Sequence, residues 1–257
     1  MTRIVDSHAH VMLQPYGSMR PQSPDAVLDA FARLGIEQAW CSSADALVAN
    51  QPDVHRRCND ELAELQTRVG DRLVGFATVD PRGGEAAAAE LERAIAELGL
   101  AGLKLHGWLQ PVSCCDPCLA PLFEVASRRR LVVIFHDGTP PITSSLQIAW
   151  LAERYPACTM ILGHGGLKDL ALTAAQAVRR HDNLYLQTDA TTLLALRRAL
   201  PLVGADKILY GSDGGFGDPR WIDYNLRKIR RRGLEPDAEA KILGGNATRL
   251  LQRAGDA

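Results

Sequence analysis

The 257-residue sequence has no apolar stretch of the roughly 20 residues that a helix needs to span a bilayer. Its N-terminus lacks the charged, apolar and small-residue succession of a secretion signal, and a strand-like pattern begins almost at once. The 29 lysines and arginines nearly balance the 30 aspartates and glutamates, and the net charge of −1 favours neither nucleic acid nor an anionic membrane as a partner. We therefore expect a cytoplasmic protein that acts on a small molecule.

Cysteine is sparse, and its spacing argues against a structural role. Six cysteines are scattered over a chain too large to need disulfide staples, which indicates a reducing compartment. The stretch SCCDPC contains Cys114, Cys115 and Cys118 with one C-x-x-C spacing. A closed zinc site usually needs a second such pair, and the sequence has none. The sequence assigns no role to this cluster.

The chain also lacks a linker, a long internal repeat and a glycine-rich dinucleotide fingerprint after its first predicted strand. Apolar β-branched runs alternate instead with amphipathic helical patterns from end to end. The predicted strands cover residues 3–9, 36–42, 72–79, 101–106, 131–137, 159–165, 183–189 and 207–213. The predicted helices cover residues 24–35, 58–70, 84–100, 119–130, 144–156, 167–181, 190–204 and a final region from 221 onward.

This alternation predicts the fold. Eight strands alternating with helices over about 250 residues are typical of a (β/α)₈ TIM barrel. A doubly wound open sheet is the alternative, but it rarely runs eight strands in one simple series. We expect a single α/β domain over residues 1–257, a distorted TIM barrel.

The first predicted strand carries two histidines two residues apart. Side chains alternate between the faces of a strand, so Asp6, His8 and His10 are expected on one face, with Val5 and Ala9 on the other. Two imidazoles at this spacing can hold one metal ion. The pair alone is weak evidence, and the rest of the chain must supply further ligands.

Further histidines and acids lie at the ends of later strands, which is where a TIM barrel places its chemistry. Five of the seven histidines fall at this one rim, whereas His55 and His181 fall in predicted helical segments. Buried histidine and aspartate are costly unless they are paired or bound to metal. The strand-end residues beyond the first strand are Lys104, His106, His136, His164, Asp189 and Asp213.

Three of these imidazoles and one carboxylate form a plausible ligand set. His8, His10, His136 and Asp213 suit one divalent ion, with Zn²⁺ expected and Mn²⁺, Fe²⁺ or Co²⁺ accepted by the same ligands. A position left for water would make the site catalytic, because the ion lowers the pKa of that water towards about 7. His164 and Asp213 are expected to move protons as general acid or base.

Other strand-end residues have two interpretations each. Lys104 and His106 are possible additional active-site residues, but they also fit simple packing. Asp189 orients a histidine or caps a helix beginning at Ala190, and we favour the cap. Asp213 could likewise serve only in a turn that caps the following helix.

The motifs DSHAH, GLKLHGW, FHDG, LGHGG, YGSD and GGNATRLL together resemble the amidohydrolase superfamily. They are most similar to the amidohydrolase-related branch that includes aminocarboxymuconate semialdehyde decarboxylase. The resemblance covers nearly the whole chain and implies a distorted TIM barrel with a divalent metal, usually zinc. It implies that His8 and His10 are the first-strand ligands, His136 the fifth-strand ligand and Asp213 the eighth-strand ligand, with His164 serving catalysis.

The chain departs from the wider superfamily in two respects. Many members with two metal ions bridge them by a carboxylated lysine on strand four. Lys104 lies on that strand, but two residues before its end and ahead of His106, so we expect one ion, with two as the alternative. The chain is also short, which leaves little room for specificity loops. Substrate contacts are expected from four loop residues: Tyr16, Arg20, Trp108 and Phe216.

Two enzyme activities fit these residues. The first is a metal-dependent hydrolase of a small amide, lactone or ester, in which an activated water attacks a carbonyl. The alternative is a decarboxylase of an unsaturated or aromatic acid on the same ligands, because one fold and one ligand set serve both reactions.

Two further interpretations of the function are weaker, and the oligomeric state is a separate question. A TatD-type nuclease would need an acidic ligand near strand four, where this chain has LKLH. A barrel that merely binds a metal or a partner would leave the rim histidines idle. A homodimer is plausible, but no residue demonstrates it.

Overall fold

The eight strands form one parallel sheet in sequential order. The computed structural model describes residues 3–15, 21–215, 219–231 and 233–255. The strands are β1 (Ile4–Val11), β2 (Ile36–Ser43), β3 (Leu73–Ala77), β4 (Gly102–Leu105), β5 (Val132–Phe135), β6 (Thr159–Leu162), β7 (Leu184–Gln187) and β8 (Ile208–Leu209). The segment after β8 returns to β1 through a parallel bridge between Ala9 and Gly214. The predicted single-domain TIM barrel is confirmed.

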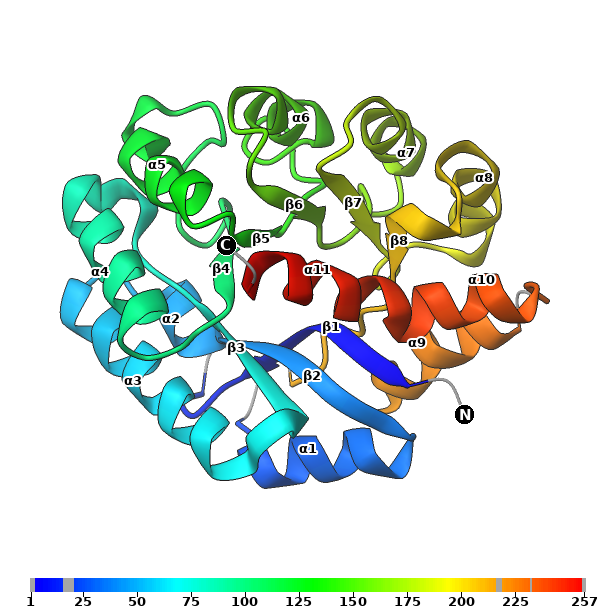
Figure 1. Ribbon diagram of the computed structural model, residues 1–257, viewed down its shortest axis with the longest axis horizontal. Helices are drawn as coiled ribbons and strands as arrows, with labels where there is room; N and C mark the ends of the chain where they lie inside the picture. The colour runs from blue at the N-terminus through cyan, green and yellow to red at the C-terminus, as the bar shows by residue number, and fades with distance from the viewer. Residues whose placement is uncertain (1–2, 16–20, 216–218, 232, 256–257) are drawn as a thin grey trace.

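Helices surround this barrel and fill the intervals between strands (Figure 1). Polar side chains define several starts, since Ser23, Ser144 and Thr192 each accept a hydrogen bond from a backbone N–H in the first turn. The helices are α1 (Pro24–Arg33), α2 (Ala44–Val48), α3 (Pro52–Val69), α4 (Glu85–Ala96), α5 (Ala120–Arg128), α6 (Ser145–Arg154), α7 (Ala171–Arg180), α8 (Leu193–Val203), α9 (Arg220–Arg230), α10 (Pro236–Ala240) and α11 (Asn246–Gly255). Among the described residues, no helix is both long and apolar enough to cross a membrane.

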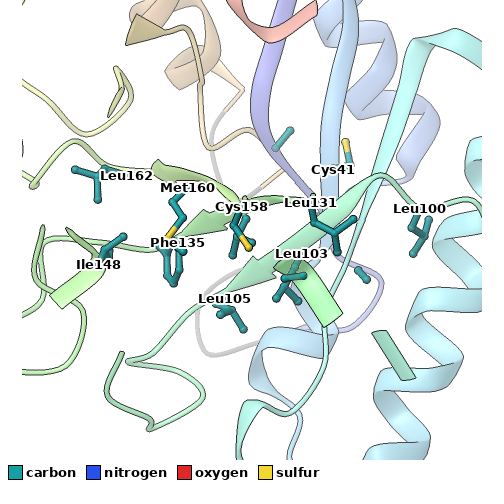
Figure 2. Close-up of a cluster of buried hydrophobic side chains, with 14 of the residues drawn as sticks. Cys41, Leu100, Leu103, Leu105, Leu131, Phe135, Ile148, Cys158, Met160 and Leu162 are labelled. Atoms are coloured by element: carbon teal, nitrogen blue, oxygen red, sulfur yellow. The ribbon is translucent and has the colours of Figure 1, made fainter. Parts of the chain in front are cut away.

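Apolar side chains form two separate clusters. The larger one joins strand residues such as Leu103, Phe135 and Met160 to helix residues such as Ile148 (Figure 2). The smaller one draws on seven strands and on α11, and α11 crosses the barrel in Figure 1. Its members are Val5, Trp40, Phe76, Val132, Ile134, Ile161, Tyr185, Leu209, Ala247 and Leu250. The first cluster therefore binds the helices to the barrel, and the second fills the barrel interior.

The interior changes from apolar to polar along each strand. Val132 and Ile134 belong to the inner cluster, and His136 follows them at the two-residue period of a strand. Leu209 is followed at the same period by Gly211 and then Asp213. The alternation that packs the interior therefore also delivers polar side chains to the C-terminal end of the barrel.

The first strand is less regular than its sequence predicts. Val5 lies in the inner cluster, whereas Ile4 and Ala9 lie in the outer one. The pairing of β1 with β2 shifts between Ile4 and Val5 and again between Asp6 and Ala9. The expectation that Val5 and Ala9 share one face is wrong, because these irregularities break the strict alternation.

Asn246 ties the start of α11 to the strand that precedes the site. Its side chain is fully buried and donates to the backbone oxygens of Ala205, at 2.7 Å, and Ile208, at 2.8 Å. Replacing Asn246 by alanine leaves both carbonyls without this donor. We expect the free energy of unfolding in urea to fall by about 1–3 kcal/mol.

Gln252→Ala provides the control, because Gln252 is exposed on the same helix. A loss of stability in N246A no larger than that in Q252A would contradict this role.

Candidate metal and active site

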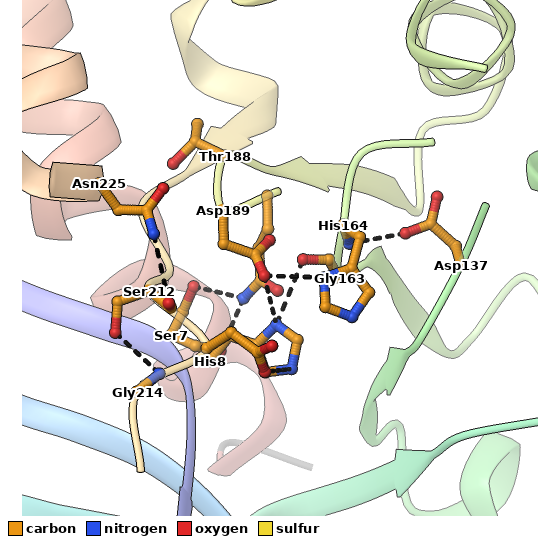
Figure 3. Close-up of polar contacts among 12 residues, drawn as sticks. Ser7, His8, Asp137, Gly163, His164, Thr188, Asp189, Ser212, Gly214 and Asn225 are labelled. Carbon is orange, nitrogen blue, oxygen red and sulfur yellow. Dashed lines mark hydrogen bonds and ion pairs between the residues drawn. The ribbon is translucent and has the colours of Figure 1, made fainter. Parts of the chain in front are cut away.

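The polar ends of the strands converge inside the barrel, and most of these side chains are shielded from solvent (Figure 3). His8, His10 and Lys104 are each 1% exposed, and His164 is 4% exposed. Asp189 is fully buried. The Asp213 side chain is 31% exposed and His136 is partly buried, so the site is closed on the side of His8 and Asp189 and open on the side of Asp213. Each buried charge in it needs a partner.

His8 lies at the centre of this group. Its Nδ1 donates to the backbone oxygen of Gly163 at 3.2 Å, which leaves the Nε2 lone pair available. Lys104 Nζ lies 2.5 Å from that Nε2, and Asp213 Oδ1 lies 3.4 Å from it. The close approach of the ring requires glycine at 163, where a Cβ would lie 3.0 Å from His8 Cε1 and 2.4 Å from the oxygen of Phe135.

Asp213 brings a carboxylate to both first-strand histidines. Its Oδ1 lies 3.1 Å from His10 Nε2, and Ser42 contacts the other ring nitrogen of His10 at 3.0 Å. Asp213 adopts a left-handed backbone conformation, with φ of 56°, and its N–H donates to the oxygen of His8 at 2.8 Å. Aspartate tolerates this conformation better than most residues. The turn places the carboxylate over β1.

His164 and Asp189 form a second pair. His164 Nδ1 lies 2.8 Å from Asp189 Oδ2, while Asp189 Oδ1 has no hydrogen-bond partner. The cap of α8 is Thr192, whose side chain accepts from Ala195 N–H. The expectation that Asp189 caps the next helix is therefore wrong, and its carboxylate orients His164 instead.

Two further rings extend the site towards solvent. His106 and His136 stack with 3.7 Å between ring centroids and an interplanar angle of 12°. His136 meets His164 edge-on at 4.1 Å. Trp108 is 62% exposed and lies 6.4 Å from His106 between centroids. The stacked pair therefore leads from the buried cluster towards the exposed Trp108, whose ring is tilted by 37° from that of His106.

Burial keeps most of these histidines neutral. It lowers the pKa of His10 to about 4 and that of His106 to about 2, and it lowers the pKa of His8 and His136 as well. A neutral imidazole offers a lone pair, which is the form that binds a metal ion.

Asp213, in contrast, is held in its charged form. Burial alone would raise its pKa, but the hydrogen bond from His10 and the charge of protonated His164 lower it well below its usual value. The pocket therefore combines neutral imidazoles with a carboxylate.

The pKa values of His164 and Lys104 shift in opposite directions. For His164, burial favours the neutral form, but the charge and hydrogen bond of Asp189 outweigh it and raise the pKa above its usual value. Burial lowers the pKa of Lys104 to about 8. His164 is therefore the imidazole of the pocket that is best able to keep a proton near neutral pH.

The donor set fits a divalent cation. Ligand atoms that bind one ion at about 2.0–2.2 Å lie about 3–4 Å apart. One possible set is His8, His164, Asp189 and Asp213, whose ligand atoms all lie within 4.8 Å of one another. A second group of atoms, those of His8, His10 and Asp213, meets at 3.1 and 3.4 Å.

The sequence-predicted residues are thus only partly brought together. His8, His10 and Asp213 meet, whereas His136 stacks on His106. Lys104 and His106 both face the pocket rather than the packing between barrel and helices. Of the four predicted substrate contacts, Trp108 lies at the mouth. The other three lie outside the described residues: Tyr16, Arg20 and Phe216.

Sequence reasoning missed the residues that hold the loops in place. Asp6 Oδ1 accepts from the N–H groups of His8 and Ser212, at 3.1 and 3.0 Å. Asp137 accepts from the N–H groups of His164 and Gly166, at 2.6 and 2.7 Å. Asp6 begins the DSHAH motif, and Asp137 directly follows His136 in FHDG. These positions indicate a role in holding the loops only once the barrel fold is known.

Comparison with known proteins identifies the family. The profile of the family described as Amidohydrolase matches residues 5–253, nearly the whole chain. The protein therefore belongs to the amidohydrolase family, and the resemblance drawn from its motifs is confirmed.

A curated relative and two solved structures are similar to this chain over most of its length. The gamma-resorcylate decarboxylase of Polaromonas sp. strain JS666 is 26% identical over 262 residues, which cover 81% of this chain and 78% of the relative. A structure of 2,6-dihydroxybenzoate decarboxylase in complex with 2,6-dihydroxybenzoate matches with a TM-score of 0.81 and 20% identity, over 98% of this chain and 99% of that one.

A dihydroxybenzoic acid decarboxylase from Polaromonas sp. JS666, with bound manganese and 2-nitroresorcinol, matches with a TM-score of 0.78 and 22% identity over 98% of this chain and 97% of that one. The solved structures bear on the fold alone at these identities. The curated relative favours the decarboxylase alternative over the hydrolase interpretation.

The Asp189 carboxylate accounts for the raised pKa of His164. In Asp189→Asn, burial acts on His164 without that opposing charge, so its pKa should fall below the ordinary value of about 6.5. The protonated fraction at pH 7 therefore decreases. Titration of metal-free protein by ¹H–¹⁵N NMR of the imidazole measures this shift.

Asp206→Asn is the matched control, because Asp206 lies on the surface in an ion pair with Lys241. An unchanged His164 pKa in D189N would show that another group sets it.

Proposed function

We propose that this protein is a metal-dependent decarboxylase of an aromatic carboxylic acid. The observation that carries the proposal is the His164–Asp189 pair, a proton donor held beside a cation-binding pocket. In the reaction, the carbon–carbon bond to the carboxylate breaks, carbon dioxide leaves, and a proton takes its place on the ring. The reaction therefore needs a positioned acid, a counter-charge for the carboxylate and a surface for the ring.

One divalent ion is proposed as the cofactor, held by His8, His10, His136 and Asp213. Asp189 Oδ2 is already committed to His164, which supports leaving that pair to proton transfer. When bound, the ion supplies positive charge that orients the substrate's oxygens and stabilises negative charge on them. Zinc is expected from the ligand types, and manganese is the alternative, because a structure of a decarboxylase with the same fold contains bound manganese.

The remaining residues supply orientation. His106 stacks on His136 through one face of its ring, and an aromatic substrate would stack on the other face of His106, where an offset arrangement is favourable. Lys104 brings a buried amine beside His8, where its protonated form balances the charge of a carboxylate. The exposed Trp108 lies beside His106, where it would contact substituents on the aromatic ring of the substrate.

His164 supplies the proton. Its Nδ1 is held by Asp189, so Nε2 is the nitrogen that faces a bound substrate and protonates the ring carbon that bears the carboxylate. Loss of carbon dioxide then restores the aromatic ring, and His164 regains a proton from solvent. Burial of the pocket keeps water from competing for this proton.

The activity test uses protein reconstituted with Mn²⁺ or Zn²⁺ and a panel of carboxyl-¹³C-labelled hydroxybenzoates, including 2,6-dihydroxybenzoate. We expect labelled carbon dioxide and the decarboxylated phenol, with no turnover of simple amides, lactones or esters. His164→Asn should lower kcat by about 10²–10⁴-fold, because it removes the acid. Hydrolysis of the amides, lactones or esters, without carbon dioxide release from the hydroxybenzoates, would overturn the proposal.

Metal content separates the two possible ligand sets. His136→Asn should lose the ion if the proposed set is right, whereas Asp189→Asn should retain it. Elemental analysis of both variants beside the wild type measures this. If H136N retains the ion and D189N loses it, the ligands are instead His8, His164, Asp189 and Asp213.

A further inference from the structure

Lys228 is a buried lysine on α9 that neither the proposed metal site nor the proposed proton transfer uses. It is 5% exposed. Its ammonium donates to three backbone oxygens of the loop between β7 and α8, those of Thr188, Asp189 at 3.0 Å and Thr191 at 2.9 Å. This loop carries the Asp189 carboxylate, so Lys228 fixes the backbone beneath the partner of His164.

Asn225 lies one turn earlier on α9 and is fully buried. Its Oδ1 accepts from Lys228 Nζ at 2.7 Å, and its Nδ2 donates to the backbone oxygen of Ser212 at 3.3 Å and of Trp221 at 3.2 Å. Lys228 can only donate and a carbonyl can only accept, so these contacts settle the orientation of the amide. Ser212 directly precedes Asp213 in the sequence, and Figure 3 shows Asn225 above Ser212.

The two side chains therefore join the loops that carry the two acids of the pocket. Asp189 Oδ2 lies 3.7 Å from His8 Nδ1, and Asp213 Oδ1 lies 3.4 Å from His8 Nε2. One imidazole thus has a carboxylate near each of its nitrogens, on loops that follow different strands. From α9, Asn225 thus reaches the loop of Asp213 and Lys228 reaches the loop of Asp189.

We propose that Asn225 and Lys228 form a positioning bridge: Lys228, anchored on the Asp189 loop, holds Asn225, and Asn225 holds the loop that places the Asp213 ligand beside His8. The inference rests on the metal site of the proposed function, but not on its substrate. Helix α9 would therefore influence the metal site without contacting the ion, by holding the backbone of two loops.

A purely structural role would not require this chemistry. Burying an ammonium costs several kcal/mol unless it is well paired, and an apolar side chain of similar length would fill the same space at less cost. A cation that gathers three carbonyls of one short loop instead specifies the path of that loop. Residues that orient metal ligands in this way typically change metal affinity by about 10–100-fold when they are replaced.

The test compares Asn225→Asp and Lys228→Met with a control at the other end of the barrel. N225D keeps an acceptor for Lys228, but it sets an oxygen against the oxygen of Ser212 and so breaks the bond to the Asp213 loop. Lys207→Met is the control, because Lys207 donates to the backbone oxygens of His181, at 3.3 Å, and Asp182, ahead of β7. All three variants lose a side-chain bond to backbone carbonyls.

The primary readout is Mn²⁺ binding to the metal-free protein, measured by calorimetry or by the EPR signal of free Mn²⁺. We expect N225D and K228M to weaken binding by about 10–100-fold and K207M to bind as the wild type does. Equal affinity in all four proteins, or equal weakening in K207M, would overturn the positioning role. Should K228M fail to fold, N225D is compared with K207M alone, because N225D retains the Lys228 cation and an acceptor for it and loses only the bond to Ser212.

Binding of the ion is measured without substrate, so this inference and the proposed function fail separately. Weakened Mn²⁺ binding in N225D, together with no carbon dioxide release by the wild type, would leave the bridge standing and reject the decarboxylase. Carbon dioxide release by the wild type, with unchanged Mn²⁺ binding in N225D and K228M, would reject the bridge alone.

Discussion

The site depends on keeping the buried His8 imidazole neutral, with an unprotonated Nε2 that faces Lys104 and Asp213. The hydrogen bond from Nδ1 to the oxygen of Gly163 fixes the tautomer, and burial holds the pKa well below its usual value. Lys104 Nζ and Asp213 Oδ1 then approach the same nitrogen. A cation at this point would satisfy both the lone pair and the carboxylate, and the neighbouring groups are arranged around that requirement.

Backbone groups stabilise the remaining buried charges. Asp6 and Asp137 each accept two backbone N–H groups, and these bonds tie β1 to the segment after β8 and the end of β5 to the loop after β6. Burial nevertheless raises the pKa of Asp6 to about 7 and that of Asp137 to about 6. The hydrogen bonds of Asp6 and Asp137 therefore fix the positions of the strand ends at the rim. In this fixed arrangement the ring of His8 lies so close to residue 163 that only glycine fits there.

Much of the fold could be predicted from the sequence, because the strands are apolar and regularly spaced. The polar strand ends His136 and Asp213 could be predicted in the same way, since each follows interior positions at the two-residue period, whereas His8 could be found from its spacing to His10. The contacts of Asn225 and Lys228 were not, because they join α9 to backbone atoms of distant loops and leave no motif. The irregular register of β1 was hidden as well, since bulges depend on pairing with β2 rather than on local sequence.

The role of Asp189 shows the same limit. Its sequence, an acid shortly before a helix, fits a cap and an orienting carboxylate equally well. The choice depends on the distance between β6 and β7, which brings His164 within 2.8 Å of it. Local sequence therefore predicts which residues reach the rim, while the pairing among them follows from the closed barrel.

The most direct test of this account is a crystal structure grown with Mn²⁺ and measured at a wavelength where manganese scatters anomalously. The account predicts one strong anomalous peak bonded to His8 Nε2 and Asp213, with Lys104 Nζ displaced from His8. A pocket without a peak at saturating Mn²⁺, with Lys104 still hydrogen-bonded to His8, would contradict it.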